Sequence, residues 1–260
     1  MSISGGVFSL RRIQLWVYTS WFEFLIRYRK TMLGPLWLLV GPALFISLLG
    51  LLYAHVGGIP VEKFIPHLTI GIVVWTLITG FLVGSTRVFQ KAQAQIMQDG
   101  IDLIDIVMVS VLSTVIHFAH QVVLIIVVLA FFKVPITPYA LVSLVGLVLL
   151  IINGIWLTIV FGIIGARFRD LAEIVQAIMR IAFLATPVIW MPSKTGRGGV
   201  MGAFLDFNPF YHFLELIRAP LLGTPIEPLS WILVLSITVT GFLLAYISTR
   251  LLAKNIALWV

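Results

Sequence analysis

Long uncharged stretches recur along the chain and predict membrane-spanning helices. Asp, Glu, Lys and Arg are absent from five of them, which are 31–61, 64–86, 106–132, 134–166 and 228–249. Each is longer than the about 20 mostly apolar residues that a helix needs to cross a bilayer. A sixth stretch, 171–190, is apolar except for Glu173 and Arg180. The pattern predicts an all-α integral membrane protein with six transmembrane helices.

The charges around these stretches predict the orientation of the chain. The six spans are expected near residues 33–56, 65–88, 106–132, 138–166, 171–190 and 229–251. An even number of spans leaves both termini on one side of the membrane. With the N-terminus inside, the inner segments hold 12 of the 17 Lys and Arg residues and the outer segments hold 5. The positive-inside rule then predicts that both termini are cytoplasmic.

Residues 8–30, ahead of the first span, have the pattern of an amphipathic helix. On a helical wheel, one side carries the polar residues Arg12, Thr19, Glu23, Arg27 and Lys30. The other side carries Leu10, Val17, Trp21, Phe24, Leu25 and Tyr28. Such a polar stripe is costly in hydrocarbon. We therefore expect a helix lying in the inner interface, rather than a longer first span, with a bend into that span at Leu33-Gly34-Pro35-Leu36-Trp37.

Two connecting segments are expected to be more than plain loops. The inner segment 90–105 carries Lys91 and three Asp residues, Asp99, Asp102 and Asp105. It is either a solvated connector or a short cytoplasmic helix that contacts a partner. The outer segment 191–227 is broken by Pro and Gly, but its apolar parts are too short to span. Re-entrant half-helices between spans five and six fit this pattern, because irregular backbone at membrane depth is tolerated only against protein or water.

Composition supports a single transmembrane domain over residues 1–260. The chain is 60% hydrophobic and only 10% charged, against about 25% charged residues in soluble domains. It has no Cys, which excludes disulfides and thiolate metal sites. The net charge of +7 comes from basic residues that flank apolar runs, which indicates contact with anionic lipid headgroups rather than with nucleic acid. No phosphate loop of the form G-x-x-x-x-G-K-[ST] is present.

Three polar residues lie inside predicted spans. His117 and His120 are one turn apart on span three, and Asn153 is on span four. A metal or proton site is one interpretation of the histidines. Hydrogen bonding between helices or lining of a pore is the other, and we favour it because the spans supply no carboxylate as a further ligand.

Two groups of charges suggest binding sites. The run from Arg167 through Arg169 and Asp170 closes the inner end of span four, where it serves as a positive-inside anchor and suits docking of a cytoplasmic protein. Arg180 lies about nine residues into span five, where a lone Arg is costly unless it pairs or faces water. Glu173 is one candidate partner for Arg180, and a phosphate on a translocation path is another.

Aromatic residues gather near the outer face. Trp190, Phe207 and Tyr211 are the ones we single out there, together with Tyr53 at the end of span one. Interfacial aromatic belts explain such residues in general. Aromatic faces also stack on sugar rings, so the same residues suit a carbohydrate path.

Four motifs together resemble one family. Arg27-Tyr28-Arg29-Lys30-Thr31-Met32-Leu33-Gly34-Pro35-Leu36-Trp37 looks like the opening signature of permease subunits of polysaccharide-exporting ABC transporters, which serve O-antigen, capsule or teichoic acid export. Ala166-Arg167-Phe168-Arg169-Asp170-Leu171 is similar to their loop between spans four and five. Thr186-Pro187-Val188-Ile189-Trp190 and Asn208-Pro209-Phe210-Tyr211-His212 resemble their segments around the outer re-entrant region. The matches run in order over nearly the whole chain.

The resemblance implies partners and a substrate. It implies a homodimer of this chain in the bacterial inner membrane, joined by two separate ATPase subunits that bind ATP and Mg, with no cofactor in this chain. The substrate implied is a glycan on a lipid carrier, typically undecaprenyl diphosphate, with O-antigen resembling best. Three alternatives stay open: capsule or teichoic acid as the substrate in place of O-antigen, export of a small molecule such as a drug, and a membrane-embedded enzyme acting on lipid-linked glycans.

The resemblance also implies roles for individual residues. The ATPase-coupling residues would be Arg167, Arg169, Asp170, Asp99, Asp102 and Glu23. The lipid-diphosphate entry would use Arg27, Arg29, Lys30 and Arg180. The glycan path would use Trp190, Phe207, Tyr211 and Tyr53.

Overall fold

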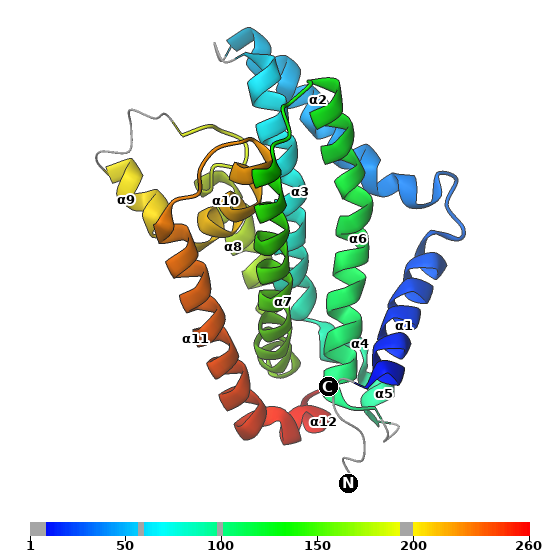
Figure 1. Ribbon diagram of the computed structural model, residues 1–260. Helices are drawn as coiled ribbons and strands as arrows, with labels where there is room; N and C mark the ends of the chain where they lie inside the picture. The colour runs from blue at the N-terminus through cyan, green and yellow to red at the C-terminus, as the bar shows by residue number, and fades with distance from the viewer. Residues whose placement is uncertain (1–8, 57–59, 98–100, 193–199) are drawn as a thin grey trace.

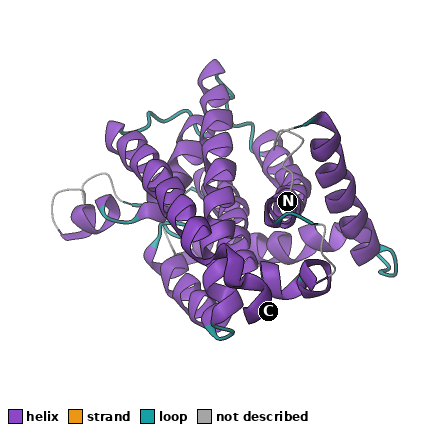
Figure 2. Cartoon of the chain, turned by 90° about the horizontal axis from the view of Figure 1, so that it is seen from below, coloured by secondary structure: helices purple, strands orange, loops and turns teal. Residues whose placement is uncertain are grey.

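The structure, a computed structural model, describes residues 9–56, 60–97, 101–192 and 200–260. It is 84% helix, and the described residues form no strand, which confirms the all-α prediction. Seen from below, the described chain consists only of helices and the loops between them (Figure 2). Asp99 lies outside the described residues.

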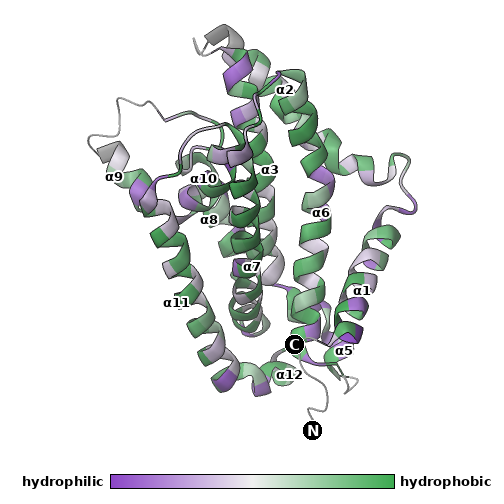
Figure 3. Ribbon diagram, viewed as in Figure 1, coloured by the Kyte–Doolittle hydropathy of each residue, from purple (hydrophilic) through white to green (hydrophobic). Residues whose placement is uncertain are grey.

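Five helical stretches in the described part of the chain are long and apolar enough to cross a membrane. They are Gly34–Tyr53, Val61–Ser85, Leu103–Phe131, Pro138–Arg167 and Pro228–Trp259. Their main helices are α2 (Trp37–Val56), α3 (Val61–Ser85), α6 (Leu103–Phe131), α7 (Val142–Arg167) and α11 (Pro228–Leu252). Helices α3, α6, α7 and α11 run lengthwise through the bundle in Figure 1, with α2 crossing at an angle, and the green apolar colour predominates on these helices in Figure 3.

The sixth predicted span is represented by the shorter helix α8 (Leu171–Ala185). Its 15 residues give a length of about 22 Å at about 1.5 Å per residue, against about 30 Å for a hydrocarbon core. The helix ends where it does because Pro187 pushes the residue before it out of the helical region, and Thr186 is extended, with φ −89° and ψ 141°. The count of six spans stays a prediction.

The segment before the first span forms helix α1 (Leu10–Tyr28), which lies against α6. Ser9 caps its start by accepting a hydrogen bond from the backbone N–H of Arg12 at 3.4 Å. A 3₁₀ turn, η1 (Gly34–Leu36), then redirects the chain into α2. Gly34 has φ +56°, a conformation that residues with a Cβ rarely adopt. The chain therefore bends at the Leu33–Trp37 motif.

Helix α3 is the centre of the bundle. Over the most apolar 18 residues of its span, 72% are buried, against 11% over the corresponding stretch of the first span. Helices α2, α6, α7, α8 and the later helix α10 all contact it. Close approach of α7 depends on small residues, as is usual between membrane helices. Gly154 lies against the ring of Phe81, and Gly162 lies against Val88 and Phe89.

At the lower end of Figure 1, short helices tie the long ones together. They are α4 (Val88–Lys91), α5 (Gln93–Met97), the 3₁₀ turn η4 (Ala253–Asn255) and α12 (Ile256–Trp259). The side-chain amide of Gln90 donates to the backbone carbonyl of Gly165 on α7 at 2.7 Å. Arg87 forms an ion pair with Glu173 on α8. The ends of α3, α7 and α8 are therefore held together here.

At the opposite end, the segment between α8 and α11 forms helices α9 (Val200–Asp206) and α10 (Pro209–Leu221). Asn208 caps α10 by accepting from the backbone N–H groups of Phe210 and Tyr211. Helix α10 packs on α3, α7 and α11, and also touches the 3₁₀ turn η2 (Pro138–Leu141) that precedes α7. Neither α9, with 7 residues, nor α10, with 13, is long enough to span a bilayer, and the re-entrant placement stays a prediction.

The contact between α3 and α7 yields a prediction. A Cβ at Gly165 would lie 1.8 Å from the carbonyl oxygen of Thr86, whereas a Cβ at Gly84 would meet no atom within 4 Å. We expect Gly165→Ala to lower the thermal unfolding midpoint of the purified protein in detergent. Gly84→Ala is the matched control, and it should leave the midpoint unchanged or raise it, because Ala is favoured over Gly inside a helix by about 0.5–1 kcal/mol. Equal midpoints for the two variants would contradict this packing.

Candidate functional site

A cavity of about 500 Å³ lies between α1, α3 and α6. We call it the polar crevice. On α1, the residues that line it are Leu15, Thr19, Glu23 and Arg27. They are spaced by four and so occupy one face of the helix. This face of α1 therefore borders the cavity, beside the buried residues Trp16, Ser20 and Phe24.

The wall on α6 is a polar stripe on an otherwise apolar helix. It comprises Asp105, Ile106, Val109, Ser110, Ser113, Thr114, His117, Phe118 and Gln121. These positions recur every three or four residues, which again defines one helix face. From Asp105 to Gln121 the stripe covers 17 residues, and its ends are about 24 Å apart at a rise of about 1.5 Å per residue. The polar crevice therefore extends well into the bundle.

Helix α3 supplies the back of the polar crevice and leaves room in it. Gly80 and Gly84 line the cavity, and the face of Gly84 opens into free space. At the deep end, the hydroxyl of Thr76 donates to the side-chain carbonyl of Gln121. The amide of Gln121 reaches the backbone carbonyl of Leu38 on α2 at 3.5 Å. Three helices therefore meet at the deep end of the cavity.

The start of α1 is fastened to α6 by charge. Arg12 donates to Asp102 at 2.6 Å and to Asp105 at 2.9 Å, and the hydrogen bond to Asp105 is the main cause that raises the pKa of its guanidinium. The indole N–H of Trp16 also donates to Asp105, at 2.6 Å. The hydroxyl of Ser20, which is fully buried, lies 3.1 Å from the backbone carbonyl of Val109. This fastening sets the distance between the two walls of the polar crevice.

The two histidines of α6, His117 and His120, join the same contact. The Nε2 atom of His117 is 3.1 Å from a guanidinium nitrogen of Arg27. His120 packs its ring on Phe24 and Trp21 of α1, with centroids 4.5 and 6.3 Å apart. These contacts support the interpretation as interhelical bonding. The described residues contain no group of three or more His, Cys, Asp or Glu that could hold a metal ion.

The predicted lipid-diphosphate residues do not all meet in one place. Arg27 lines the polar crevice, while Arg29 and Lys30 are exposed just after the end of α1 and are not part of its lining. Arg180 is exposed on α8, and no residue of α8 lines the polar crevice. Its suggested pairing with Glu173 is wrong, because Glu173 forms an ion pair with Arg87 instead.

The predicted ATPase-coupling residues fall into two groups. Arg169 and Asp170 are exposed in the turn between α7 and α8. Arg167 beside them lies over the rings of Phe168 and Trp259, at 5.5 and 5.2 Å from their centroids. Asp102 is paired with Arg12 at the same end of the molecule. Glu23, by contrast, lies in the polar crevice, where the Ser113 hydroxyl is 3.4 Å away.

The four predicted glycan-path aromatics differ in accessibility. Phe207 is 89% exposed, whereas Tyr211 is only 2% exposed. Tyr53 stacks on Phe64 with centroids 4.5 Å apart. Trp190 is half-buried, and its indole N–H donates to the carbonyl of Leu184 at 3.1 Å. Of these four side chains, Phe207 alone is largely open to its surroundings in this arrangement.

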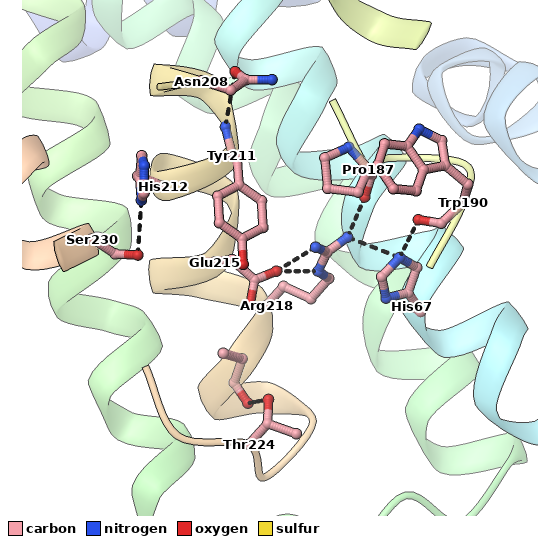
Figure 4. A network of polar contacts seen from close by, with 11 residues as sticks. His67, Pro187, Trp190, Asn208, Tyr211, His212, Glu215, Arg218, Thr224 and Ser230 are labelled. Carbon is pink, nitrogen blue, oxygen red and sulfur yellow. Dashed lines mark hydrogen bonds and ion pairs between the residues drawn. The ribbon is translucent and has the colours of Figure 1, made fainter. Parts of the chain in front are cut away.

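A buried charged network holds α10 in place (Figure 4). Arg218 is only 2% exposed. It forms an ion pair with Glu215 one turn earlier and donates to the backbone carbonyl of Pro187, at 2.6 Å. It also lies 3.0 Å from the Nε2 atom of His67 on α3. Arg218 therefore joins α10 to α3 and to the turn that follows α8.

Polar side chains make a second contact on α10 and one on α7. His212 lies 2.9 Å from the Ser230 hydroxyl on α11 and 3.0 Å from the backbone carbonyl of Asp206. Asn153 donates to the hydroxyl of Thr238 on α11 at 2.8 Å. The Asn153 contact supports the interhelical interpretation made from the sequence.

Sequence reasoning missed the most connected of these groups. Arg218 and Glu215 are three residues apart in an apolar segment, which is a local signal for a buried pair. Arg12 and Asp105 are 93 residues apart, and no local pattern joins them. The polar crevice left only a partial signal, the polar stripe on each of two helices, because its existence depends on how three helices are placed.

The sequence also matches a known family. Residues 14–222 match the family described as ABC-2 type transporter. The chain belongs to this family. No individual curated protein gives a significant match.

Membership in the ABC-2 family agrees with the architecture. The chain is the membrane subunit of an ABC exporter, a multi-pass helical permease that associates with ATPase subunits. The permease therefore needs a surface that receives the ATPase and a path for the substrate. The lower end with its exposed Arg169 and Asp170 is a candidate for the former.

The Arg218 network of the ABC-2 permease makes a testable prediction. In Arg218→Met, the carboxylate of Glu215 and the carbonyl of Pro187 lose their charged partner. Breaking a buried pair in this way costs about 3–5 kcal/mol, and we expect the lower end of that range because the Glu215 side chain is 19% exposed. Thermal unfolding in detergent should show a lower midpoint than for Lys254→Met, an exposed control. Matching midpoints for the two variants would show that the network does not hold α10.

Proposed function

We propose that this ABC-2 permease exports lipid-linked polysaccharide, O-antigen on undecaprenyl diphosphate. It works as a homodimer with two ATPase subunits, which bind ATP and Mg. The dimer lies in the bacterial inner membrane with both termini in the cytoplasm. ATP binding by the partners moves the glycan outward through the dimer.

One observation carries this proposal: the exposed surface of α8 has polar side chains among its apolar ones. Gln176 and Arg180 are both exposed on α8 and are four residues apart, among exposed Ile174, Ile178 and Ile181. A face with an amide and a guanidinium does not suit lipid chains. It suits a water-filled path completed by a second copy of the chain.

Helix α2 adjoins this face. Phe64, Gly71 and Trp75 of α3 fall within about 40° of each other on a helical wheel. Phe64 stacks on Tyr53 of α2, while Trp75 contacts Phe183 of α8 and Gly71 contacts Val188 just after it. Helices α2 and α8 therefore pack on the same side of α3. In a dimer, these two helices are well placed to line a channel wide enough for a sugar chain.

The basic residues just before the first span support the proposal that the substrate carries a lipid diphosphate. Arg27, Arg29 and Lys30 are all exposed around the end of α1. Arg presents a fork of donors that matches phosphate oxygens, and a cluster of cations beside the inner leaflet attracts anionic head groups. On this proposal, the diphosphate first meets the transporter here.

The lower end supports coupling to an ATPase. The exposed turn with Arg169 and Asp170 is followed directly by α8. Close contact of Gly165 with Thr86, and the Arg87–Glu173 ion pair, connect this turn to α3. A force applied to the turn therefore reaches both the α8 wall and the central helix.

A second candidate function is export of a small amphiphilic molecule. The volume of the polar crevice, about 500 Å³, falls within the about 300–1,000 Å³ of small-molecule sites. Loss of surface polysaccharide in cells that lack this chain would favour the first candidate. Unchanged polysaccharide with increased sensitivity to amphiphilic compounds would favour the second.

Neutralising the basic cluster tests the proposed entry site. We expect Arg27→Gln, Arg29→Gln and Lys30→Gln together to lower polysaccharide export at least tenfold, because the diphosphate loses its charge partners. Labelling of surface polysaccharide measures export, and size-exclusion chromatography checks that the dimer persists. The matched control is the triple variant of the exposed residues Lys63, Lys133 and Lys254 to Gln. Equal export by the two triple variants would argue against this entry site.

Changing the exposed turn tests the coupling surface. We expect Arg169→Ala with Asp170→Ala to abolish stimulation of the ATPase by the permease, since both charges that fix the docking register are gone. ATP turnover by the reconstituted complex measures this effect. Glu62→Ala with Lys63→Ala at the start of α3 is the control, and it should keep normal stimulation. A double variant at the turn that co-purifies with the ATPase and keeps full stimulation would contradict the assignment.

A further inference from the structure

The polar crevice lies apart from the surface of α2 and α8 that the proposed channel uses. Its lining comes from α1, α3, α6 and the α4–α5 segment, and Leu38 is the one residue of α2 in it. The proposed passage of a polymer through the dimer gives this cavity no role. Its polar walls therefore need a separate explanation.

The hydroxyl groups on α6 are arranged to accept further hydrogen bonds. The Thr114 hydroxyl donates to the backbone carbonyl of Ser110 at 3.0 Å, which leaves its lone pairs free to accept from a ligand. Ser110 lies one turn before Ser113 and Thr114 on α6, a helix apolar enough to cross a membrane. Polar side chains at such positions are expensive and mark binding sites or ion paths. The wall is thus suited to a ligand with many hydroxyl groups.

Charge in the polar crevice favours an anion beside Arg27. The carboxylate of Asp105 is already bonded to Arg12 and Trp16. Among the described residues, the Arg27 guanidinium contacts the ring of His117, and a guanidinium has five N–H donors. Lys91 adds a second cation at the α4 end of the lining, and Glu23 is the carboxylate one turn from Arg27. A phosphate at Arg27 with a sugar hydroxyl at Glu23 satisfies both groups.

The shape of the polar crevice matches a compact head group. Gly84 leaves an open hollow in the α3 wall, with no atom within 4 Å of the position of a Cβ. Phe118 gives the same cavity an aromatic surface, and aromatic faces pack well on the apolar face of a sugar ring. The polar crevice therefore combines the guanidinium of Arg27, the hydroxyl groups of α6, the open space at Gly84 and the ring of Phe118.

We propose that the polar crevice binds the phosphosugar head of a membrane lipid, with the phosphate at Arg27 and the first sugar between Thr19, Ser113 and Thr114. This inference rests on the proposed function, because it assigns the first sugar next to the diphosphate to a site within each protomer. The polar crevice binds the sugar next to the diphosphate before the polymer enters the dimer channel. The permease thereby discriminates a sugar-bearing carrier from an empty one.

Binding measurements on the permease purified with its ATPase subunits test the inference. Three probes are used: a polyprenyl diphosphate that carries one N-acetylhexosamine, the same diphosphate without sugar, and phosphatidylglycerol. Native mass spectrometry gives the Kd of each. We expect the sugar-bearing probe to bind at least tenfold more tightly than the sugar-free probe. Phosphatidylglycerol should bind more weakly than both.

Two variants locate this preference. Gly84→Phe fills the hollow, and Ser113→Ala with Thr114→Val removes hydroxyls with little change of volume, so the second variant serves if the first does not fold. Each should reduce the sugar preference at least fivefold. Val239→Phe, on the exposed surface of α11, is the matched control and should keep the wild-type preference.

Three results would overturn the inference. They are the absence of a sugar preference in the wild type, an unchanged preference in Ser113→Ala with Thr114→Val, and binding of phosphatidylglycerol as tight as that of the sugar-bearing probe. The last would identify a site for bulk lipid head groups.

Cell experiments separate this inference from the proposed function. If the crevice variants export polysaccharide normally, and export still requires the chain, then the inference about the polar crevice is wrong and the proposed polysaccharide export stands. If surface polysaccharide persists in cells that lack the chain, the proposed function is wrong. Even then, loss of the sugar preference in both crevice variants would show that the polar crevice binds the sugar.

Discussion

The close approach of α7 to its neighbours is the constraint on which the rest of the bundle depends. Glycines repeat along α7, and at each of Gly146, Gly154, Gly162 and Gly165 an added Cβ would lie within 3 Å of another element. In a bilayer, no hydrophobic force drives helices together, and dispersion contacts between closely packed backbones take its place. The glycines of α7 allow α3 and α10 to approach this closely. The polar crevice, the channel surface and the lower end are all positioned by helices that pack on α3.

This packing explains how one chain holds polar groups among apolar helices. Arg218, Asn153 and Gln121 are each hydrogen-bonded to a neighbouring helix or turn. Buried polar groups without partners are expensive in an apolar medium. The structure meets this requirement twice, in the Arg218 network at one end and in the contact of α1 with α6 at the other. Between these two ends, apolar residues predominate on the long helices (Figure 3), and the polar side chains of the crevice on α6 interrupt them.

Some of this could be predicted from the sequence, and the rest could not for physical reasons. Five uncharged stretches identified the long helices, because hydrocarbon selects composition over about 20 residues. Gly34 and Pro35 identified the bend, because backbone conformation there is local. The polar stripe of α1 was visible, but the partner was not, since Asp105 and His117 approach it from far along the chain. Tyr211 lies in a segment that resembled an outer aromatic belt, yet its ring is buried in the helix that Asn208 caps.

The bond between Arg12 and Asp105 has a consequence for biosynthesis. Its partners are 93 residues apart, and at about 5–20 residues per second a ribosome needs roughly 5 to 20 s to make the intervening chain. During that time α1 already exists, with its apolar side chains and its basic residues, but α6 does not. Anionic head groups at the membrane surface are the natural partners for Arg12 and Arg27 in this interval. The Arg12–Asp105 contact of α1 can therefore form only after the chain of the third long helix has been made.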